Sequence, residues 1–268
     1  MTNGSFQKPA AKASQPRPTR VILTGVRSAV IGPNIIIDAY RTAVATIIVG
    51  LDSDVALRVK DNSDVEANYN PVVLIPPSTF CELQSDGEIA IIFCDALSDD
   101  YNQVDFIDIN LKIKRLRDLL KRGPKNKTPE QFLKEVFVEL GVKSSRRIRP
   151  DIRRVVSVLG REPERFDNVE IAAEIAGLSP MRFQHVFTET LGMPFRRYRQ
   201  WRRMGRVIRS MADGKTLTEA AYASGFSNSA HLSTAFKAMF GLRPSDLFTN
   251  NIEYYSVSYT HLTLPTKA

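Results

Sequence analysis

A pattern that occurs twice between Gly177 and Pro244 constrains most strongly what this chain can fold into. Each copy has a glycine, then two apolar residues four positions apart, then a second glycine five positions later. The first copy consists of Gly177, Phe183, Phe187 and Gly192, and the second of Gly225, Leu232, Phe236 and Gly241. A glycine ends a helix at low cost because it adopts the left-handed conformation, and a serine or asparagine after it caps the next helix. Each copy therefore predicts a helix-turn-helix.

The second helix of each copy divides into a buried face and a free face. Apolar residues at helical spacing predict the buried faces, which are Phe183, Val186 and Phe187 in the first copy and Leu232, Phe236, Met239 and Phe240 in the second. The residues left for the free faces are Met181, Arg182, Gln184, His185 and Thr188 in the first copy and Ser229, His231, Ser233, Thr234 and Lys237 in the second.

A basic helix is predicted between the two copies, roughly from Phe195 to Met211. Its length is about 25 Å at 1.5 Å per residue. Two recognition helices held that far apart, or a little more, can enter successive major grooves on one face of DNA, which lie about 34 Å apart. Most of the arginines of this helix are expected to form a solvated or salt-bridged face.

The region from about Arg149 to Asn250 resembles the DNA-binding domain of AraC/XylS-type transcription regulators, which carry two helix-turn-helix units joined by a long helix. The most specific part is the stretch GFSNSAHLSTAFKAMFGLRPSDLF, where the matching residues are Gly225, Phe226, Ser229, His231, Leu232, Phe236, Lys237, Phe240, Gly241 and Pro244. One departure is Thr234, where the family often has an arginine. It leaves the base preference of the second recognition helix open.

The free faces predict which side chains reach DNA. Base edges carry the sequence information, whereas phosphate contacts position the protein. Gln184 can pair with adenine, Arg182 with guanine, and Met181 can meet a thymine methyl group. The remaining expected contacts are His185, Thr188, Ser229, His231, Ser233 and Thr234, with Lys237 assigned to phosphate. The resemblance adds Arg196 and Arg197, because helix starts of the family approach the DNA backbone there. The alternative is a merely solvated helix face, and it is strongest for Ser233.

Charge separates the two halves of the chain. Residues 20–110 hold 5 Lys and Arg against 14 Asp and Glu, a net charge of −9, whereas residues 143–250 hold 19 against 10, a net of +9. The connecting residues 111–142 hold 9 against 4, a net of +5. The half with the repeated pattern is therefore the one suited to a polyanion.

Short runs rich in Val and Ile, separated by turn residues, predict strands in the N-terminal half. They are VILTGV, NIIIDAY, ATIIVGL, VALRVK, PVVLIPP and EIAIIFC, and they favour a sandwich or barrel. The stretch LIPPSTFCELQSDGEIAIIFCD resembles the end of the cupin-like sensor domain that often precedes an AraC-type domain. Tyr40, Arg41 and Phe80 are candidates to line a ligand pocket, the alternative being core or surface positions.

A metal site is not expected. The three histidines, His185, His231 and His261, all lie outside the strand region, and Glu82 and Glu88 are too few to replace them. Cys81 and Cys94 are interpreted as small apolar residues in strands. We therefore expect no cofactor and no enzyme activity, and the competing hypothesis of a cupin-type metalloenzyme would need a bound metal.

Five segments are predicted: an arm over residues 1–19, a cupin-like sensor domain over 20–106, helices over 107–142, the DNA-binding domain over 143–250, and a tail over 251–268 that is non-native or unordered. The helix from Asp108 to Arg122 has one apolar stripe, formed by Ile113, Leu116, Leu119 and Leu120. Periodicity does not choose between packing on the barrel and pairing with a second copy, and the resemblance slightly favours the dimer. No apolar run reaches the length of a membrane span, and the N-terminus has no apolar signal core.

The chain is thus expected to be a cytoplasmic, sequence-specific transcription regulator that binds double-stranded DNA in two successive major grooves. A small-molecule effector in the sensor domain, a homodimer and RNA polymerase are the further partners expected. The alternatives are the enzyme named above and a nonspecific DNA binder. The effector, the operator and the choice between activation and repression stay open.

Overall fold

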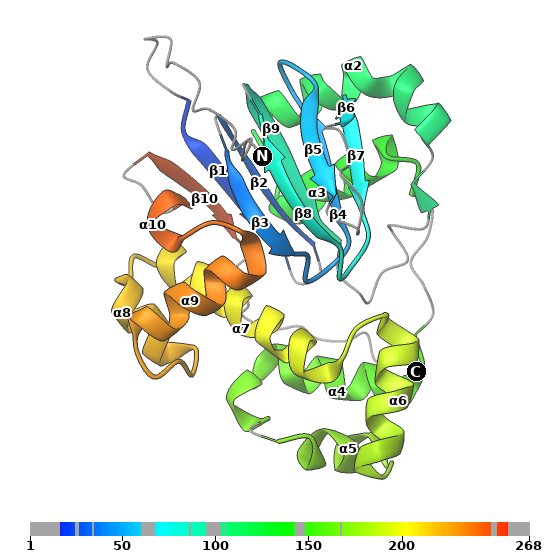
Figure 1. Ribbon diagram of the computed structural model, residues 1–268, viewed down its shortest axis with the longest axis vertical. Coiled ribbons are helices and arrows are strands. Elements are labelled where there is room, and N and C mark those ends of the chain that lie inside the picture. Colours follow the sequence, from blue (N-terminus) through cyan, green and yellow to red (C-terminus); the bar gives the residue numbers. More distant parts are fainter. Residues whose placement is uncertain are drawn as a thin grey trace, which may run out of the picture.

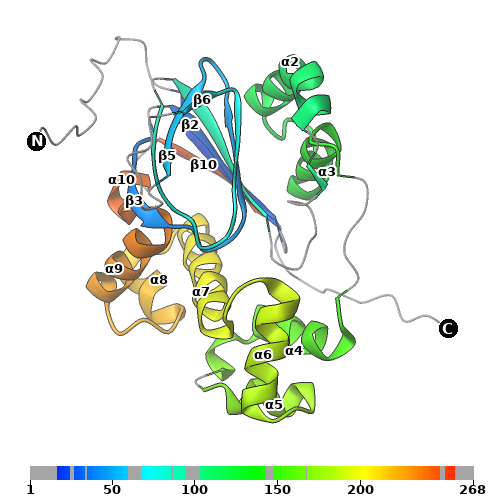
Figure 2. The ribbon, with the colours of Figure 1, turned by 45° about the vertical axis from the view of Figure 1, so that its right-hand side comes forward.

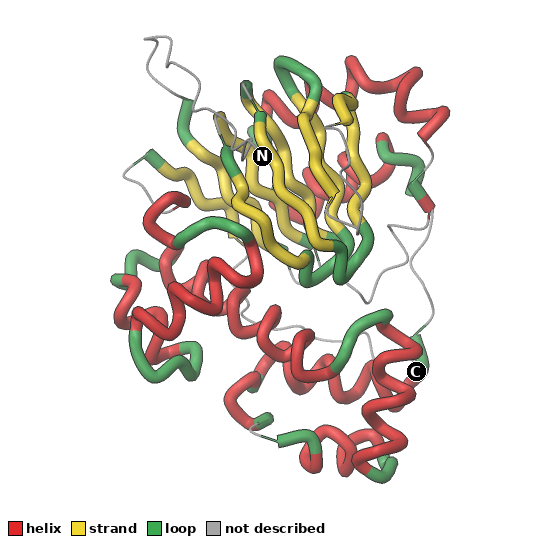
Figure 3. The backbone as a smooth tube through the Cα atoms, in the orientation of Figure 1, coloured by secondary structure: helices red, strands yellow, loops and turns green. Residues whose placement is uncertain are grey.

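The structure is a computed structural model of the 268-residue chain. It describes residues 17–24, 27–33, 35–59, 68–85, 87–94, 103–104, 106–142, 148–166, 168–247 and 251–256. Strands gather in one half of the molecule, and helices form the other half and flank the strands (Figures 1 and 3). This confirms the predicted fold, a β-rich N-terminal domain followed by an all-α domain with paired helix-turn-helix units.

The described strands form two sheets. They are β1 (Thr19–Leu23), β2 (Ser28–Pro33), β3 (Ile37–Arg41), β4 (Thr46–Gly50), β5 (Val55–Val59), β6 (Asn68–Asn70), β7 (Val72–Ile75), β8 (Phe80–Gln84), β9 (Glu88–Phe93) and β10 (Ile252–Ser256). One sheet has six strands in the order β10-β1-β2-β9-β4-β7, and the other has four in the order β3-β8-β5-β6. Each of the six predicted runs contains or overlaps one of these strands.

The two sheets enclose an apolar core because side chains alternate along each strand. Ile48 and Ile91 of the six-stranded sheet share one buried cluster with Leu83 of the four-stranded sheet. Their neighbours Ile47 and Ile92 belong to a second cluster on the outer face of the six-stranded sheet. Strands β4 and β9 are therefore buried on both faces, which explains why they are continuous apolar runs rather than alternating ones.

Helices α2 (Phe106–Arg122) and α3 (Pro129–Glu139) cover this outer face (Figure 2). Leu116, Leu119 and Leu120 of α2 are buried in the same cluster as the outward-facing residues of the sheet. The apolar stripe of α2 is thus used to pack on the β domain, which was one of the two alternatives that its periodicity left open. The dimer remains a hypothesis.

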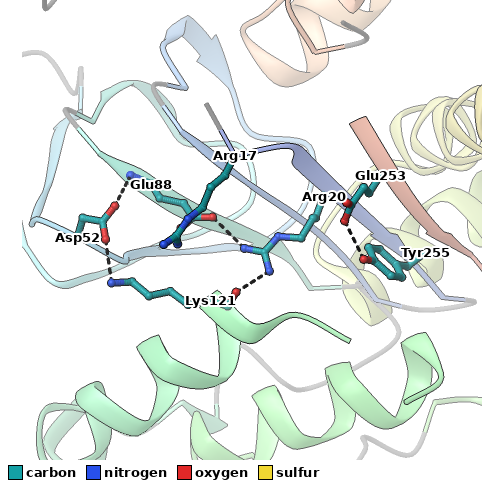
Figure 4. A network of polar contacts seen from close by, with 7 residues as sticks. All are labelled: Arg17, Arg20, Asp52, Glu88, Lys121, Glu253 and Tyr255. Atoms are coloured by element: carbon teal, nitrogen blue, oxygen red, sulfur yellow. Dashed lines mark hydrogen bonds and ion pairs between the residues drawn. The ribbon is translucent and has the colours of Figure 1, made fainter. Parts of the chain in front are cut away.

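A polar network fastens α2 to the sheet (Figure 4). Glu88 of β9 is buried, and its carboxylate pairs with Arg20 at 2.8 Å and with Arg17 at 3.0 Å. Arg20 also donates to the backbone carbonyl of Lys121 at 2.8 Å, and the Lys121 ammonium pairs with Asp52 at 2.8 Å. The hydrogen bond from Lys121 lowers the pKa of Asp52. Strand β1, strand β9 and the end of α2 are therefore joined by charge as well as by packing.

Four strands were not among the predicted runs. Strand β2 ends in Gly32-Pro33, β6 has three residues, and β8 carries Glu82 and Gln84, so none reads as an apolar run. Strand β10 lies in the predicted tail and pairs in parallel with β1. Its residues alternate, with Ile252 and Tyr254 against one apolar cluster and Tyr255 against another. Residues 257–268, which include His261, lie outside the described residues, as do residues 1–16 of the expected arm.

Strand β3 is an edge strand with an irregularity. Ile37 pairs with Leu83 and Tyr40 with Cys81, so β3 has one more residue than β8 between these pairs. Such a bulge leaves a residue out of the ladder. The backbone N–H of Asp38 donates instead to the carbonyl oxygen of Gly241 in the helical domain, at 2.9 Å.

The helical domain has the predicted repeat. Its helices are α4 (Pro150–Arg161), α5 (Glu170–Ala176), α6 (Pro180–Leu191), α7 (Phe195–Ala212), α8 (Leu217–Ala223), α9 (Ser229–Phe240) and α10 (Pro244–Leu247), with a short 3-10 helix at Pro163–Arg165. Glycines at Gly177, Gly192, Gly225 and Gly241 have φ values of 71°, 72°, 77° and 72°. All four adopt the left-handed conformation, which was predicted for Gly177 and Gly225, and the pairs α5–α6 and α8–α9 form the two helix-turn-helix units.

Candidate nucleic-acid interface

Helix α6 presents the first candidate recognition face. The side chain of Ser179 accepts a hydrogen bond from the N–H of Arg182 and so caps the helix. Phe183, Val186 and Phe187 are buried as predicted. The expected DNA contacts Met181, Arg182, Gln184, His185 and Thr188 are all exposed. Met181 is 84% exposed, so its side chain is accessible to a partner.

Helix α9 presents the second candidate face. Asn228 caps it by accepting from the N–H of His231 at 2.7 Å. His231 and Thr234 are exposed, and Ser229, Ser233 and Lys237 are half-buried. The hydroxyl of Ser233 donates to the carbonyl of Ser229, and that of Thr234 to Ala230, as Thr188 of α6 does to Gln184. These three hydroxyls therefore keep only acceptor capacity for another molecule.

Helix α7 joins the two units. It has 18 residues, and so it spans about 27 Å. Arg196 at its start is exposed, whereas Arg197 is half-buried and donates to the carbonyls of Arg41 at 2.7 Å and Thr42 at 2.9 Å. Burial lowers the pKa of Arg197, and the charge of Arg41 adds to that effect. Of the two arginines expected at phosphate, one is thus open to solvent and the other is bound to the β domain.

The β domain and the helical domain share apolar cores. Val44 belongs to the cluster of the first helix-turn-helix, and Val21, Leu23, Val30 and Ala43 belong to that of the second. At the junction the rings of Phe93, Trp201 and Phe240 form a triangle with centroid distances of 5.4, 5.6 and 5.7 Å. A displacement of either domain would therefore disturb the packing of the other.

A cavity of about 480 Å³ lies between strands β1 and β2 and helix α7. Phe93, Trp201 and Ile208 contribute to its apolar wall. Its basic residues are Arg27, Arg161, Arg202, Arg206, Arg209 and Lys215, and Asp213 is the sole carboxylate among the described residues that line it. An apolar wall with such an excess of positive charge suits an amphipathic anion. The arginines of α7 that were expected to be solvated or salt-bridged contribute to this wall.

Tyr40, Arg41 and Phe80, the candidate pocket residues of the β domain, do line a common groove. Its other side is α9, through Ser233, Thr234 and Lys237. Lys237 pairs with Asp38 of β3 at 2.8 Å. Asp38 was not predicted as a functional residue, because an aspartate within a strand sequence carries no local signal for a distant lysine.

The sequence also led to predictions about metal sites, membrane-spanning helices and the two cysteines. The described residues contain no group of three or more His, Cys, Asp or Glu side chains arranged to hold a metal ion. Over the same part of the chain, no helix is both long and apolar enough to cross a membrane. Cys81 and Cys94 are buried and are not joined in a disulfide, and burial raises the pKa of Cys81 to about 12.

Comparison with known proteins gives two kinds of match. Residues 172–250 match a family described as a helix-turn-helix domain. The whole fold is similar to ToxT of Vibrio cholerae. A point variant of apo ToxT from strain SCE256 has a TM-score of 0.56 at 14% identity, over 84% of this chain and 97% of that chain. ToxT from strain O395 has a TM-score of 0.52 at 15% identity, over 83% and 97%.

A third structure, wild-type ToxT from strain SCE256 with a bound unsaturated fatty acid, has a TM-score of 0.52 at 15% identity, over 88% of this chain and 96% of that chain. At these identities the likeness establishes the fold. It extends over the β domain and the helical domain together.

Proposed function

We propose that this protein, a DNA-binding transcription regulator with an AraC-type helix-turn-helix domain, reads two successive major grooves with α6 and α9. The observation that supports this most directly is the arrangement of the two capped recognition helices at the ends of α7. Helix α7 has 18 residues and is about 27 Å long, and recognition helices somewhat further apart than this length would match one turn of B-DNA, about 34 Å.

Helix α6 has the residues for direct readout. Arg182 can donate two hydrogen bonds to guanine, Gln184 can pair with adenine, and Met181 can contact a thymine methyl group. All three side chains are exposed on one helix beyond its cap. Arg196 is the proposed phosphate contact at the start of α7. A phosphate contact of Arg197 would require it to leave the carbonyls of Arg41 and Thr42.

Selection from a randomised DNA pool tests this proposal. The full chain is bound to the pool at fixed salt, and the retained DNA is sequenced. We expect a two-part site whose halves lie about one helical turn apart. Enrichment of no sequence, together with a steep salt dependence, would instead establish the nonspecific DNA binder. Metal analysis of the same purified protein tests the alternative of a cupin-type metalloenzyme, because that alternative requires a stoichiometric bound metal.

We further propose that the cavity between β1, β2 and α7 binds an amphipathic carboxylate as effector. Six basic residues and an apolar wall favour such a molecule. ToxT, which has the same fold, has been crystallised with an unsaturated fatty acid bound. The proposal extends to the ligand class and not to one compound.

Calorimetric titration with oleate, below the concentration at which it forms micelles, tests the effector site. We expect Arg206→Gln to weaken binding roughly tenfold or more, because a hydrogen bond to a charged group contributes about 1.5–3 kcal/mol. Arg153→Gln is the matched control, since Arg153 is exposed on α4 and is not a cavity residue. Methyl oleate, which has no charge, should bind weakly to all three proteins. Equal binding of both lipids would contradict an anion site.

A further inference from the structure

The two recognition helices have different neighbours. Helix α6 packs against α5 and α7, whereas α9 packs against α8, α10 and also strand β3 of the β domain. We infer that β3 is an autoinhibitory clamp, which occupies part of the face with which α9 would enter a major groove. This inference rests on the proposed function, because it concerns the regulation of the same DNA-binding surface.

The first contact of the clamp is a backbone hydrogen bond made by a residue within the bulge of β3. The N–H of Asp38 donates to the carbonyl of Gly241 at 2.9 Å. The approach is so close that a Cβ atom on Gly241 would stand 2.3 Å from Ile37 Cγ2 and 2.5 Å from the carbonyl oxygen of Asp38. Glycine at this position therefore serves two purposes. It ends α9 in the left-handed conformation, and it lets the strand lie directly against the end of the helix.

Side chains extend the contact along α9 toward its middle. Lys237, which is expected at a phosphate, pairs with the carboxylate of Asp38 at 2.8 Å. One helical turn before it, Ser233 and Thr234 line the groove whose other wall includes Tyr40 and Phe80. Three of the five expected contacts of α9 thus line the groove that α9 shares with the β domain, and Ser233 and Lys237 are half-buried there. The carboxylate of Asp38 takes the place that a DNA phosphate would take next to Lys237.

DNA and β3 exclude each other at this face. An α-helix with its side chains is about 10–12 Å wide, and the major groove is about 12 Å wide. A recognition helix in the groove therefore has no room for a protein strand along the face that meets the bases. Ser229 and His231, at the N-terminal end of α9, lie outside the shared groove, so the clamp limits how deeply α9 inserts rather than hiding the whole helix.

The contact is suited to release. The side chains of Asp38 and Lys237 are 63% and 44% exposed, so their ion pair is screened by solvent and is weak. Phe240 provides a path for control, since it precedes Gly241 in the chain, lines the effector cavity and packs on Phe93 and Trp201. A ligand in the cavity would touch the residue next to the clamp.

A cleavable cross-link between β3 and α9 tests the clamp in the full chain. Ala39 and Ala238 are exposed and line the same groove from opposite sides. The double variant Ala39→Cys with Ala238→Cys is treated with a bis-maleimide that contains a reducible disulfide. Cys81 and Cys94 are buried, which protects them from the reagent. Affinity is measured for the selected two-part site and for the site with only the α6 half intact.

We expect the cross-linked protein to bind the two-part site at least tenfold more weakly than before treatment, and cleavage of the reagent to restore the affinity. Binding to the α6 half-site should stay within about twofold. The single-cysteine variants, treated in the same way, control for the reagent. Unchanged affinity of the cross-linked protein for the two-part site would overturn the clamp. Failure of the untreated protein to prefer any sequence would instead overturn the proposed function, so the two failures are distinguishable.

A charge variant tests the same contact without a reagent. Asp38→Asn removes the carboxylate beside Lys237, and we expect about two- to fivefold tighter binding to the two-part site at low salt. Asp54→Asn is the matched control, since Asp54 is also a half-exposed aspartate of the β domain but pairs with Arg117 of α2. The change in net charge is the same in both. Equal effects of the two variants would show that net charge, and not the clamp, determines the affinity, and would contradict the inference.

Discussion

Helices α6 and α9 share one motif and differ in what surrounds them. Both begin at a side-chain cap, bury an apolar stripe and end at a left-handed glycine with a φ of 72°. At Gly192, the end of α6, an added Cβ would meet nothing within 4 Å, whereas at Gly241 it would meet β3. The repeated sequence pattern thus produces two helices of the same local structure. Their tertiary contacts differ, because the C-terminal end of α6 is open whereas that of α9 lies against β3.

The comparison is tested most strongly by adding one methyl group to each glycine. Both Gly192→Ala and Gly241→Ala should lose roughly 1–2 kcal/mol of stability from the left-handed conformation. Gly241→Ala should lose about 1–3 kcal/mol more, because the strand and the helix must separate. Urea unfolding of the two variants measures the difference. Equal losses would mean that the close approach of β3 to Gly241 does not exist in solution.

Base readout should also differ between the helices. Gln184→Ala removes an exposed amide from α6, and we expect it to cost about 1–3 kcal/mol in affinity and to relax base preference in one half-site. Ser233→Ala should change little, since its hydroxyl already donates to Ser229 within α9. Pool selection with each variant reports both effects. A Gln184 variant with an unchanged preference would remove that residue from the interface.

The strand pair beneath α9 should be sensitive to alkali. Burial raises the pKa of Cys81 from 9.0 to about 12, and burial also raises the pKa of Tyr40, which pairs with it across β3 and β8. Above pH 9 the unfolded chain loses the thiol proton while the folded chain keeps it. Stability should therefore fall as pH rises, by at most about 1.4 kcal/mol per pH unit from Cys81.

Urea unfolding between pH 8 and pH 10.5 measures this slope. Cys81→Ala should reduce the slope, since the variant has no thiol to ionise in either state, and the slope that remains should include the contribution of Tyr40. A slope identical to that of the wild type would show that the thiol ionises as readily in the folded chain as in the unfolded one.

The smallest expected effect concerns phosphate contacts. Arg196→Ala should reduce the slope of log affinity against log salt by about one unit. Lys237→Ala should reduce it by less, because Lys237 must leave the carboxylate of Asp38, and the freed carboxylate attracts a cation that offsets part of the counterion release from DNA. Equal slopes for the two variants would mean that Lys237 is not paired in the free protein.

Many features of the fold could be predicted because they depend on residues that are close together in the sequence. Gly177 and Gly225 were predicted as left-handed caps because an αL residue at a helix end is a local requirement, and Gly192 and Gly241 of the same pattern have the same conformation. The runs that became β4 and β9 were predicted from their Val and Ile content and the turn residues between the runs, and the structure explains this composition because both strands are buried on two faces. The free face of α6 followed from the spacing of Phe183 and Phe187.

What the sequence did not predict depends on contacts between distant residues. The stripe of α2 identified its apolar face but not the sheet that covers it. The pairing of Lys237 with Asp38 requires a bulge in β3 and the approach of two domains, and no local pattern encodes either. Strand β10 was missed because five residues gain strand structure only when β1 offers its edge.

Strand β10 also determines how far the second helix-turn-helix can travel. Helix α10 ends at Leu247, and the carbonyl of Asn251 accepts a hydrogen bond from the N–H of Thr19 in β1, so four peptide units connect the helical domain to the sheet. Four such units reach roughly 15 Å when extended. The C-terminal end of the helical domain is therefore held close to β1 through β10. Release of α9 can therefore carry it no further than this short tether allows, unless β10 itself detaches from the sheet.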